Sequence, residues 1–311
     1  MTRFILRRLV HGLVAMLVAS VVIFGSLFLA PGSPVTALTA GRPVNTHTRE
    51  LLEKRYDLNA PFVVQYADWL GRAVRGDFGT SYVESESVSA VMAPRIDTTL
   101  ILVCMCSLVI VVAGTLSGAI AALKRGFLGT AMVVAEAIGL GIPTFVASLL
   151  LIAVFSVQLG WFPVYGSGAG FIDELWHLTL PAIALALSSV AYIGRLTQAS
   201  VEGELEKEHV TTATVRGLPR GRVIRRHVLR NASIPVATAS GIVIAYLVVG
   251  AAVVETAFSL NGLGALLVSA ISQDDFPVIQ AVSLIAVAAF IGVGFVVDVI
   301  CARLDPRITL E

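Results

Sequence analysis

The chain has 311 residues, of which 56% are hydrophobic and 14% are charged. Soluble domains carry about 25% charged residues, so this composition excludes a soluble enzyme, a disordered chain and a disulfide-rich secreted scaffold. The formal net charge of +1 gives no overall field that would attract nucleic acid.

Six stretches are apolar enough and long enough for a helix to cross a bilayer, which takes about 20 residues. They are Leu9–Ala30, Thr98–Leu123, Thr130–Gln158, Leu178–Thr197, Pro235–Val254 and Val278–Ala302. The first could also be a signal peptide, but its 22 uncharged residues exceed the usual apolar core of about 7–15, which favours its retention. Pro143 is expected to kink the third stretch.

Between the first and second spans lies segment 31–97, which holds 15 charged residues of both signs and six aromatic residues. Thr46–Tyr56 is expected to form a short helix. Asn59-Ala60-Pro61 is a helix start signal, and the apolar residues that follow recur at helical spacing. The segment is therefore predicted to be a small helical subdomain packed on the membrane surface, with a solvated loop as the alternative.

Glycines and charges inside the spans carry further expectations. Gly114-x-x-x-Gly118 in the second span allows close helix approach. Glu136 in the third span and Arg195 near the end of the fourth are a candidate intramembrane pair or gate, because charge is costly within a bilayer. Glu255 and Asp298 lie near span ends and are expected to reach the membrane interface.

Segment 198–234, between the fourth and fifth spans, is the main polar connection on the other side. It begins with alternating glutamates and becomes strongly basic after Arg216. Gly217-Leu218-Pro219 interrupts the helical pattern, and a narrow apolar stripe follows within Arg220–Arg230. We expect a helix, a sharp turn and a second helix here.

Lysine and arginine set the expected orientation. They cluster before the first span, after the second, in segment 198–234 and after the sixth span, while the short connections 159–177 and 255–277 contain neither. Because basic residues favour the cytoplasmic side, both termini and segment 198–234 are expected in the cytoplasm.

Motifs for chemistry are missing from the sequence. None of the three lysines follows a glycine, so there is no phosphate-binding loop of the Walker type, and there is no His-Glu-x-x-His zinc motif. The five histidines are scattered, and Gly166-Ser167-Gly168 is expected to form a turn rather than a nucleophile site. Asp173-Glu174 and Asp274-Asp275 are expected to cap helices, with cation attraction as the alternative. We therefore expect no catalytic residue, no metal, no cofactor and no enzyme activity; an intramembrane enzyme is disfavoured.

Segment 198–234 resembles the "EAA loop" of permease subunits in bacterial ATP-binding-cassette (ABC) importers, in which Glu-Ala-Ala precedes a glycine by three residues. The matching stretch is Thr211-Thr212-Ala213-Thr214-Val215-Arg216-Gly217-Leu218, and Ile234-Pro235 follows later. The glycine and the third position fit this pattern, whereas the Glu and the first Ala are replaced by threonines.

More of the chain is similar to the first, B-type, permease subunit of the dipeptide, oligopeptide and nickel importers. The similarity rests on the order and spacing of several short motifs along nearly the whole chain. These are Pro31-Gly32-Ser33-Pro34, Tyr56-Asp57-Leu58-Asn59, Gly76-Asp77-Phe78-Gly79, Leu159-Gly160-Trp161-Phe162-Pro163, Val253-Val254-Glu255-Thr256, Gly262-Leu263-Gly264 and Leu304-Asp305-Pro306-Arg307.

The resemblance implies an all-α membrane protein with six transmembrane helices, the type I ABC importer permease fold, and an external helical insertion after the first helix. The implied division is 1–30 for the cytoplasmic N-terminus and first span, 31–97 for the external subdomain, 98–197 for the second to fourth spans, 198–234 for the cytoplasmic coupling loop, 235–302 for the last two spans and 303–311 for the cytoplasmic C-terminus.

It also implies the coupling residues. The candidates that would contact an ATPase subunit are Thr211, Thr212, Ala213, Val215, Arg216, Gly217 and Leu218. Ala213 and Gly217 would permit close approach, Leu218 or Val215 would fill an apolar pocket, and Arg216 would meet acidic or backbone acceptors.

The implied function is a permease subunit in the inner membrane that forms half of a translocation pathway for short peptides. The implied partners are a homologous second permease, two P-loop ATPase subunits, an extracytoplasmic solute-binding protein, the peptide and membrane lipid, with no nucleic acid. Nickel complexes, haem or another small solute remain alternative cargoes. A carrier that works without an ATPase is a distant alternative, although no inverted repeat is visible.

Overall fold

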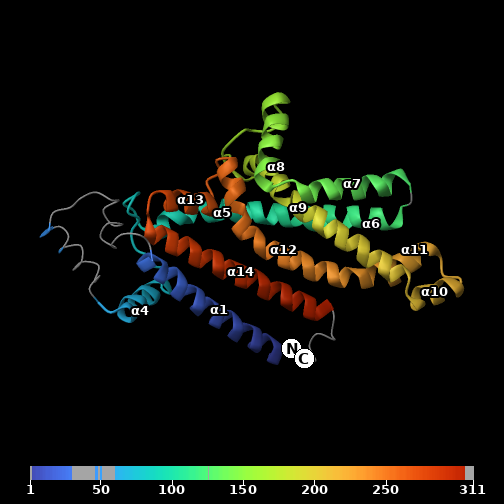
Figure 1. The fold of residues 1–311 in the computed structure, drawn as a ribbon, viewed down its shortest axis with the longest axis horizontal. Helices are drawn as coiled ribbons and strands as arrows, with labels where there is room; N and C mark the ends of the chain where they lie inside the picture. The colour runs from blue at the N-terminus through green and yellow to red at the C-terminus, as the bar shows by residue number, and fades with distance from the viewer. Residues whose placement is uncertain (1, 30–45, 48–49, 51–59, 125, 305–311) are drawn as a thin grey trace.

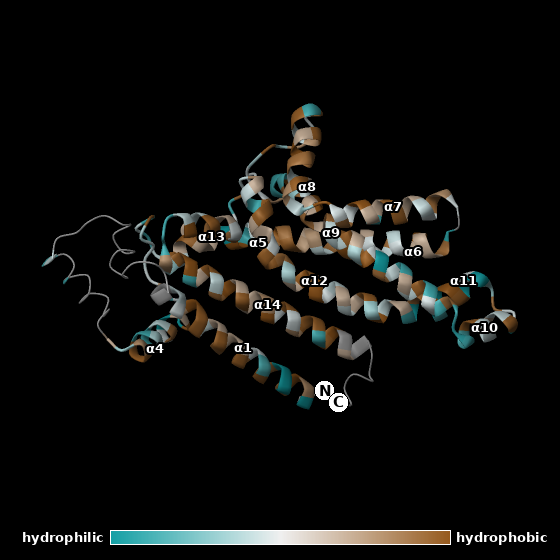
Figure 2. Ribbon diagram, viewed as in Figure 1, coloured by the Kyte–Doolittle hydropathy of each residue, from teal (hydrophilic) through white to brown (hydrophobic). Residues whose placement is uncertain are grey.

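The computed structural model describes residues 2–29, 46–47, 50, 60–124 and 126–304. Within them the structure is helical apart from turns and one isolated bridge between Thr80 and Ser87. Figure 1 shows long helices lying side by side, with α10 and α11 at one end of the molecule and α4 and α13 toward the other. Apolar residues dominate the long helices, and polar residues gather around α10 and α11 (Figure 2).

Among the described residues, five helical runs are long and apolar enough to span a membrane. They are α1 (Thr2–Leu29); α5 (Val88–Val109) continued through the π-helical η1 (Ile110–Gly114) into α6 (Thr115–Leu123); α9 (Phe171–Leu205); α11 (Arg220–Val223) continued through the π-helical η3 (Ile224–Leu229) into α12 (Arg230–Ala257); and α14 (Phe276–Leu304). A helix satisfies its own backbone hydrogen bonds, so such runs suit a bilayer.

The third predicted span, Thr130–Gln158, is a bent pair rather than one kinked helix. Helix α7 (Phe127–Gly141) is followed by α8 (Thr144–Leu151) and the π-helical η2 (Ile152–Gln158), which turn away by 108°. Ile142 is extended, because the helical conformation is sterically disfavoured for a residue before proline. Pro143 itself is extended as well. The expected kink at Pro143 is therefore a break.

Helix α9 is the centre of the bundle and contacts α5, α6, α7, α8 and α12. A side-chain carbon on Gly118 of α6 would overlap the carbonyl of Gly194 on α9. A side-chain carbon on Gly114 would lie within 3.0 Å of Ile193 of α9. The predicted close approach through Gly114 and Gly118 is thus confirmed, with α9 as the neighbouring helix.

The described part of the predicted external segment packs on α1. Helix α4 (Phe62–Ala73) begins directly after Pro61, as predicted, and the ring of Trp69 lies 5.3 Å from that of Phe24 in α1. The Tyr66 hydroxyl and the Ser20 hydroxyl of α1 are 2.7 Å apart. The predicted helix over Thr46–Tyr56 falls mainly outside the described residues. Residues 88–97, expected in the external segment, form the first turns of α5.

A short apolar helix, α13 (Leu263–Ser272), lies where only a connection was expected. It packs against α12, α14 and α5. Its buried side faces a cluster that includes Val88 and Val91 of α5 and Val278 of α14. With ten residues it measures about 15 Å, which is half the thickness of a bilayer core.

Candidate functional site

The segment singled out by sequence folds as a compact corner, which we call the elbow: α10 (Glu208–Val215), the turn through Gly217, and α11. Val210 and Ala213 of α10 pack with Val201 of α9 and with Val223 and Val228. The elbow is therefore held to the ends of two membrane helices by an apolar core of its own.

The turn at the end of α10 explains why position 217 is a glycine. Gly217 has φ +78°, a left-handed conformation that suits glycine. The N–H of Leu218 donates to the carbonyl of Ala213 (3.3 Å), and the N–H of Gly217 donates to that of Thr214 (3.0 Å). These two bonds define a Schellman motif, and Ala213 and Leu218 belong to the same apolar cluster, as is usual for this motif.

The candidate coupling residues divide between two faces of the elbow. Ala213 is buried and Leu218 packs on the elbow core, so both are turned toward their own chain. The expectation that Ala213 permits close approach of a partner, and that Leu218 fills a partner's pocket, does not fit this placement. Thr211, Thr212 and Arg216 are exposed, and Val215 is 82% exposed.

The exposed face borders an open groove. It is lined by Glu206, Glu208, Thr211, Thr212, Val215 and Arg216. An apolar valine with threonines at its side, an arginine and two glutamates form a mixed surface that suits a protein partner. A large exposed apolar side chain within a polar rim is typical of protein contacts.

A buried carboxylate fixes the elbow to the bundle. Glu204, at the end of α9, is 5% exposed. It accepts a hydrogen bond from the side-chain amide of Asn231 in α12 (2.8 Å) and forms an ion pair with Lys207 (2.5 Å) just before α10. Its carboxylate also lies 3.2 Å from the His209 ring in α10. In the sequence Glu204 is only one member of an acidic run, and no signal there distinguishes it from its neighbours.

Glu136 and Arg195 do not meet as an ion pair among the described residues. Glu136 of α7 is 3% exposed and its carboxylate lies against Gly194 of α9, where a side chain would overlap it. Arg195 is exposed on α9. The Ser117 hydroxyl of α6 lies beside the Glu136 carboxylate, although no hydrogen bond to either oxygen has standard geometry among the described residues. The two residues thus sit on neighbouring helices without a direct contact.

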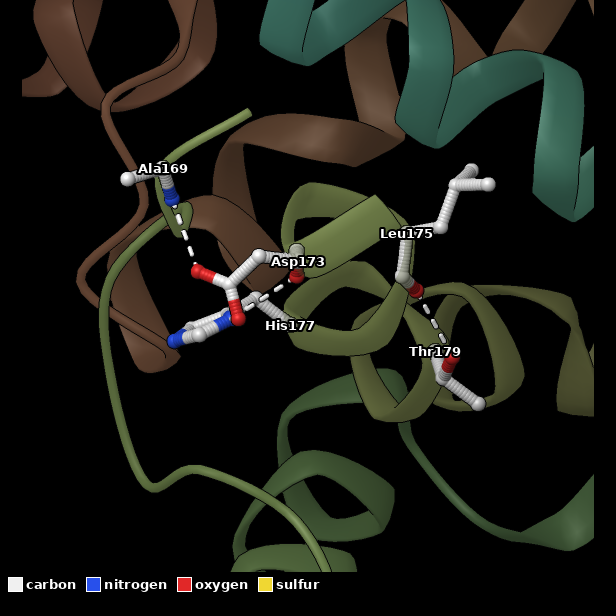
Figure 3. A network of polar contacts seen from close by, with 5 residues as sticks. All are labelled: Ala169, Asp173, Leu175, His177 and Thr179. Atoms are coloured by element: carbon white, nitrogen blue, oxygen red, sulfur yellow. Dashed lines mark hydrogen bonds and ion pairs between the residues drawn. The ribbon is translucent and has the colours of Figure 1, made fainter. Parts of the chain in front are cut away.

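Near the start of α9 an aspartate stabilises the first turn (Figure 3). Asp173 accepts a hydrogen bond from the N–H of Ala169 (2.8 Å), and its carboxylate lies 3.4 Å from the His177 ring. Asp173 thus ties the connection before α9 to its first turn, but no side chain caps the start of the helix itself, so the expected capping is not found here. Ser167 accepts a hydrogen bond from the N–H of Asn261 (3.0 Å), so Gly166-Ser167-Gly168 ties two connections together, as a turn rather than a nucleophile.

Two further carboxylates at the end opposite the elbow are buried. Glu255 is 0% and Asp275 is 2% exposed. Glu255, expected at the membrane interface, lies inside the protein instead. Asp275, expected to cap a helix, accepts side-chain hydrogen bonds from the Ser81 hydroxyl (2.5 Å) and the Tyr82 N–H (3.2 Å). Asp298 is partly exposed and pairs with Arg8 of α1 at 3.0 Å.

Among the described residues, no group of three or more His, Cys, Asp or Glu side chains could hold a metal ion. Helix α10 is exposed at one end of the molecule, and α13 packs tightly against α12 at the other end. The continuous helical run from α11 to α12 connects the two ends. Such an arrangement can bind a protein partner and move as a unit.

Comparison with known proteins gives matches along the chain. Residues 110–310 match a family described as "binding-protein-dependent transport system inner membrane component", and residues 1–103 match the model of its N-terminal region. A probable peptide ABC transporter permease protein of Sinorhizobium fredii is 33% identical, covering 98% of each chain. An oligopeptide transport system permease protein of Bacillus subtilis is 34% identical, and a glutathione transport system permease protein of Escherichia coli is 35% identical, each covering 99% of both chains.

Proposed function

The chain belongs to the family of binding-protein-dependent transport system inner membrane components, and on that premise we propose that it forms half of a translocation pathway for short peptides. The family consists of multi-pass permease subunits of ABC transporters, which work with a second permease, ATPases and a binding protein. Peptide cargo is supported by the names of relatives that match nearly the whole chain, which are peptide and oligopeptide permeases.

We propose that the elbow is the surface on which an ATPase subunit docks. The observation that carries this is the division of α10 into two faces. Val210 and Ala213 hold it to the bundle, while Val215 and Arg216 are presented outward beside Thr211 and Thr212. Val215 would insert into an apolar pocket of the ATPase, and Arg216 would meet an acidic group or carbonyls at its rim.

We infer the orientation in the membrane from the position of the elbow. The elbow end would lie in the cytoplasm together with both termini, since the ATPases act there and the basic residues of segment 198–234 favour that side. Helix α4 and α13 would then lie on the outer side, where a solute-binding protein delivers its ligand. A second permease would complete the pathway, and ATP-driven closure of the ATPases would push the elbow as a rigid body.

The direct test is purification of the tagged chain from its native membrane in mild detergent, with partners identified by mass and ATP hydrolysis measured. We expect a second six-span protein and P-loop ATPases to co-purify. A co-purifying binding protein could then be assayed with defined di- and tripeptides, nickel complexes and haem. Recovery of the chain without any ATPase would contradict the proposal and favour a carrier that works alone.

A further inference from the structure

Helix α13 is capped by residues from two other helices. The N–H of Ala265, in its first turn, donates to Oε2 of Glu255 in α12 (2.9 Å). The N–H of Leu263 donates to the hydroxyl of Thr99 in α5 (2.9 Å), and that hydroxyl donates to Oε1 of Glu255 (2.7 Å). Glu255 and Thr99 thus satisfy two free N–H groups at the start of the helix, and we call this buried pair the relay.

Charge and shape both favour this contact. A carboxylate next to a helix N-terminus is attracted by the partial positive charge of the free N–H groups. Side chains are excluded around it: a Cβ on Gly262 would overlap the Glu255 carboxylate, and one on Gly264 would overlap the backbone of Ala252 in α12. Helix α13 therefore docks on α12 backbone to backbone, with Glu255 enclosed at 0% exposure.

The relay sits at the far end of the helical run that begins in the elbow. Residues 220–257 form 38 consecutive helical residues, a length of about 57 Å. The run begins two residues after Leu218 of the elbow core and ends two residues after Glu255. A push on the elbow would consequently displace the residue that holds α13.

Helix α13 also has a side that nothing in the described chain covers. Ile271 is 56% and Val268 is 40% exposed, while Leu266 and Ala270 are buried. The short turn after α13 is fixed separately, because Asp275 binds the turn at residues 81–83. The helix is therefore held at both ends and presents one apolar side away from its own chain.

We propose that Glu255, through Thr99, is a positioning residue that makes α13 follow α12, so that α13 moves when an ATPase drives the elbow. The proposal rests on the proposed function, because it needs an ATP-driven movement at the elbow. It assigns α13 the role of a moving element at the outer mouth of the pathway, and it assigns the buried relay the task of transmitting the movement.

The test uses the whole complex, purified from native membranes and reconstituted in lipid vesicles. The native cysteines at positions 104, 106 and 301 are replaced by alanine, and Ile271→Cys places a single reactive thiol on the exposed side of α13. The rate of labelling by a membrane-impermeant maleimide is measured without nucleotide and with ATP plus vanadate. ATP hydrolysis is measured on the same samples.

The variants separate the relay from general stability. Glu255→Gln keeps the volume but cannot accept from both Thr99 and Ala265 through oxygen, and Thr99→Val removes the hydroxyl at nearly constant size. Thr99→Ser keeps the hydroxyl and should restore the behaviour of the parent. Glu174→Gln is the matched control, since Glu174 accepts from the neighbouring Thr98 (3.3 Å) without touching α13.

In the parent complex, which carries the Ile271→Cys substitution, we expect ATP to change the labelling rate at position 271. Glu255→Gln and Thr99→Val should lose this change while the complex still assembles and hydrolyses ATP, whereas Thr99→Ser and Glu174→Gln should keep it. An unchanged ATP response in Glu255→Gln, or no ATP response in the parent complex with active ATPases, would overturn the inference. Failure to recover any ATPase with the parent chain would instead overturn the proposed function on which it rests.

Discussion

At the elbow, Glu204 joins α9 to the start of α10 and to α12; at the opposite end, Glu255 joins α12 to α5 and α13. Both carboxylates are buried and both collect bonds from elements far apart in the chain. Their partners differ. The side chains of Lys207 and His209 are 59% and 41% exposed, whereas Glu255 meets a backbone N–H and a buried hydroxyl.

This difference separates a surface that has to adapt from one that has to keep its internal contacts while it moves. The partners of Glu204 can exchange their bonds for water, so the elbow can adjust when another protein docks on it. The partners of Glu255 have no such exchange available. The elbow is accordingly suited to receive a movement, and the α13 corner is suited to follow it without deforming.

The largest expected effect is that of Glu255→Ala. It leaves the Thr99 hydroxyl and the Ala265 N–H unsatisfied in a buried site, so the free energy of unfolding should fall by about 3 kcal/mol. Glu204→Ala should lower it by about 1–2 kcal/mol, because water can reach the freed partners. Thermal unfolding in detergent, followed by tryptophan fluorescence, compares the two, with the exposed Glu202→Ala as control. Equal losses would contradict the distinction between the two sites.

The next effect is on the turn of the elbow. Gly217→Ala places a side chain on a left-handed residue and should cost about 1–2 kcal/mol. Gly221→Ala is the matched control: that glycine lies in α11 with open space around it, so alanine should be neutral or slightly stabilising. ATPase co-purification and unfolding temperature should fall only for Gly217→Ala. Equal behaviour of the two variants would show that the conformation of Gly217 does not matter.

A smaller effect is expected where the external segment is attached. Asp275→Asn removes the charge that accepts from Ser81 and Tyr82, and should weaken the attachment by about 1 kcal/mol. Limited proteolysis of vesicles should then cleave near residues 79–87 faster than in the parent. Asp274→Asn, next to it but exposed, should not change the cleavage rate. Equal cleavage rates for Asp275→Asn and the parent would refute the anchoring role.

The smallest effect is that of the pair between α1 and α14. Arg8 and Asp298 are 3.0 Å apart but partly exposed, with side chains 47% and 30% accessible. Exposed pairs contribute about 0.2–1 kcal/mol, so Arg8→Ala should shift the unfolding temperature only slightly. The exchanged pair, Arg8→Asp with Asp298→Arg, should recover most of that shift. A loss as large as that of Glu255→Ala would contradict the account.

Hydropathy is sufficient to predict the long membrane helices, because an apolar run of about 20 residues without charge matches the thickness of the bilayer core. It is insufficient for α13, whose ten residues are too short to register as a span. The proline in the third predicted span indicates a kink at Pro143, but the helix breaks there instead. The steric effect of proline on Ile142 is local, but the 108° turn depends on packing that sequence spacing does not contain.

Some features of the polar sites can likewise be predicted from the sequence, and others cannot. The glycine that ends α10 can be predicted from its position, since a left-handed residue at a helix end favours glycine. The inward side of α10 is not evident from the resemblance, although Val210 and Ala213 are three residues apart and share a helix face. The burial of Glu255 depends on Gly262 and Gly264 making room beside α12, which only the folded chain shows.

Site-directed photocrosslinking can show whether an ATPase subunit docks on the elbow. A photoreactive amino acid replaces Val215, 82% exposed on the elbow, or Ile172, 84% exposed near the start of α9 at the opposite end, in cells that make the whole complex. We expect position 215 to crosslink to a P-loop ATPase subunit and position 172 not to do so. Crosslinks from position 215 to lipid alone, or equal ATPase crosslinks from both positions, would contradict docking at the elbow.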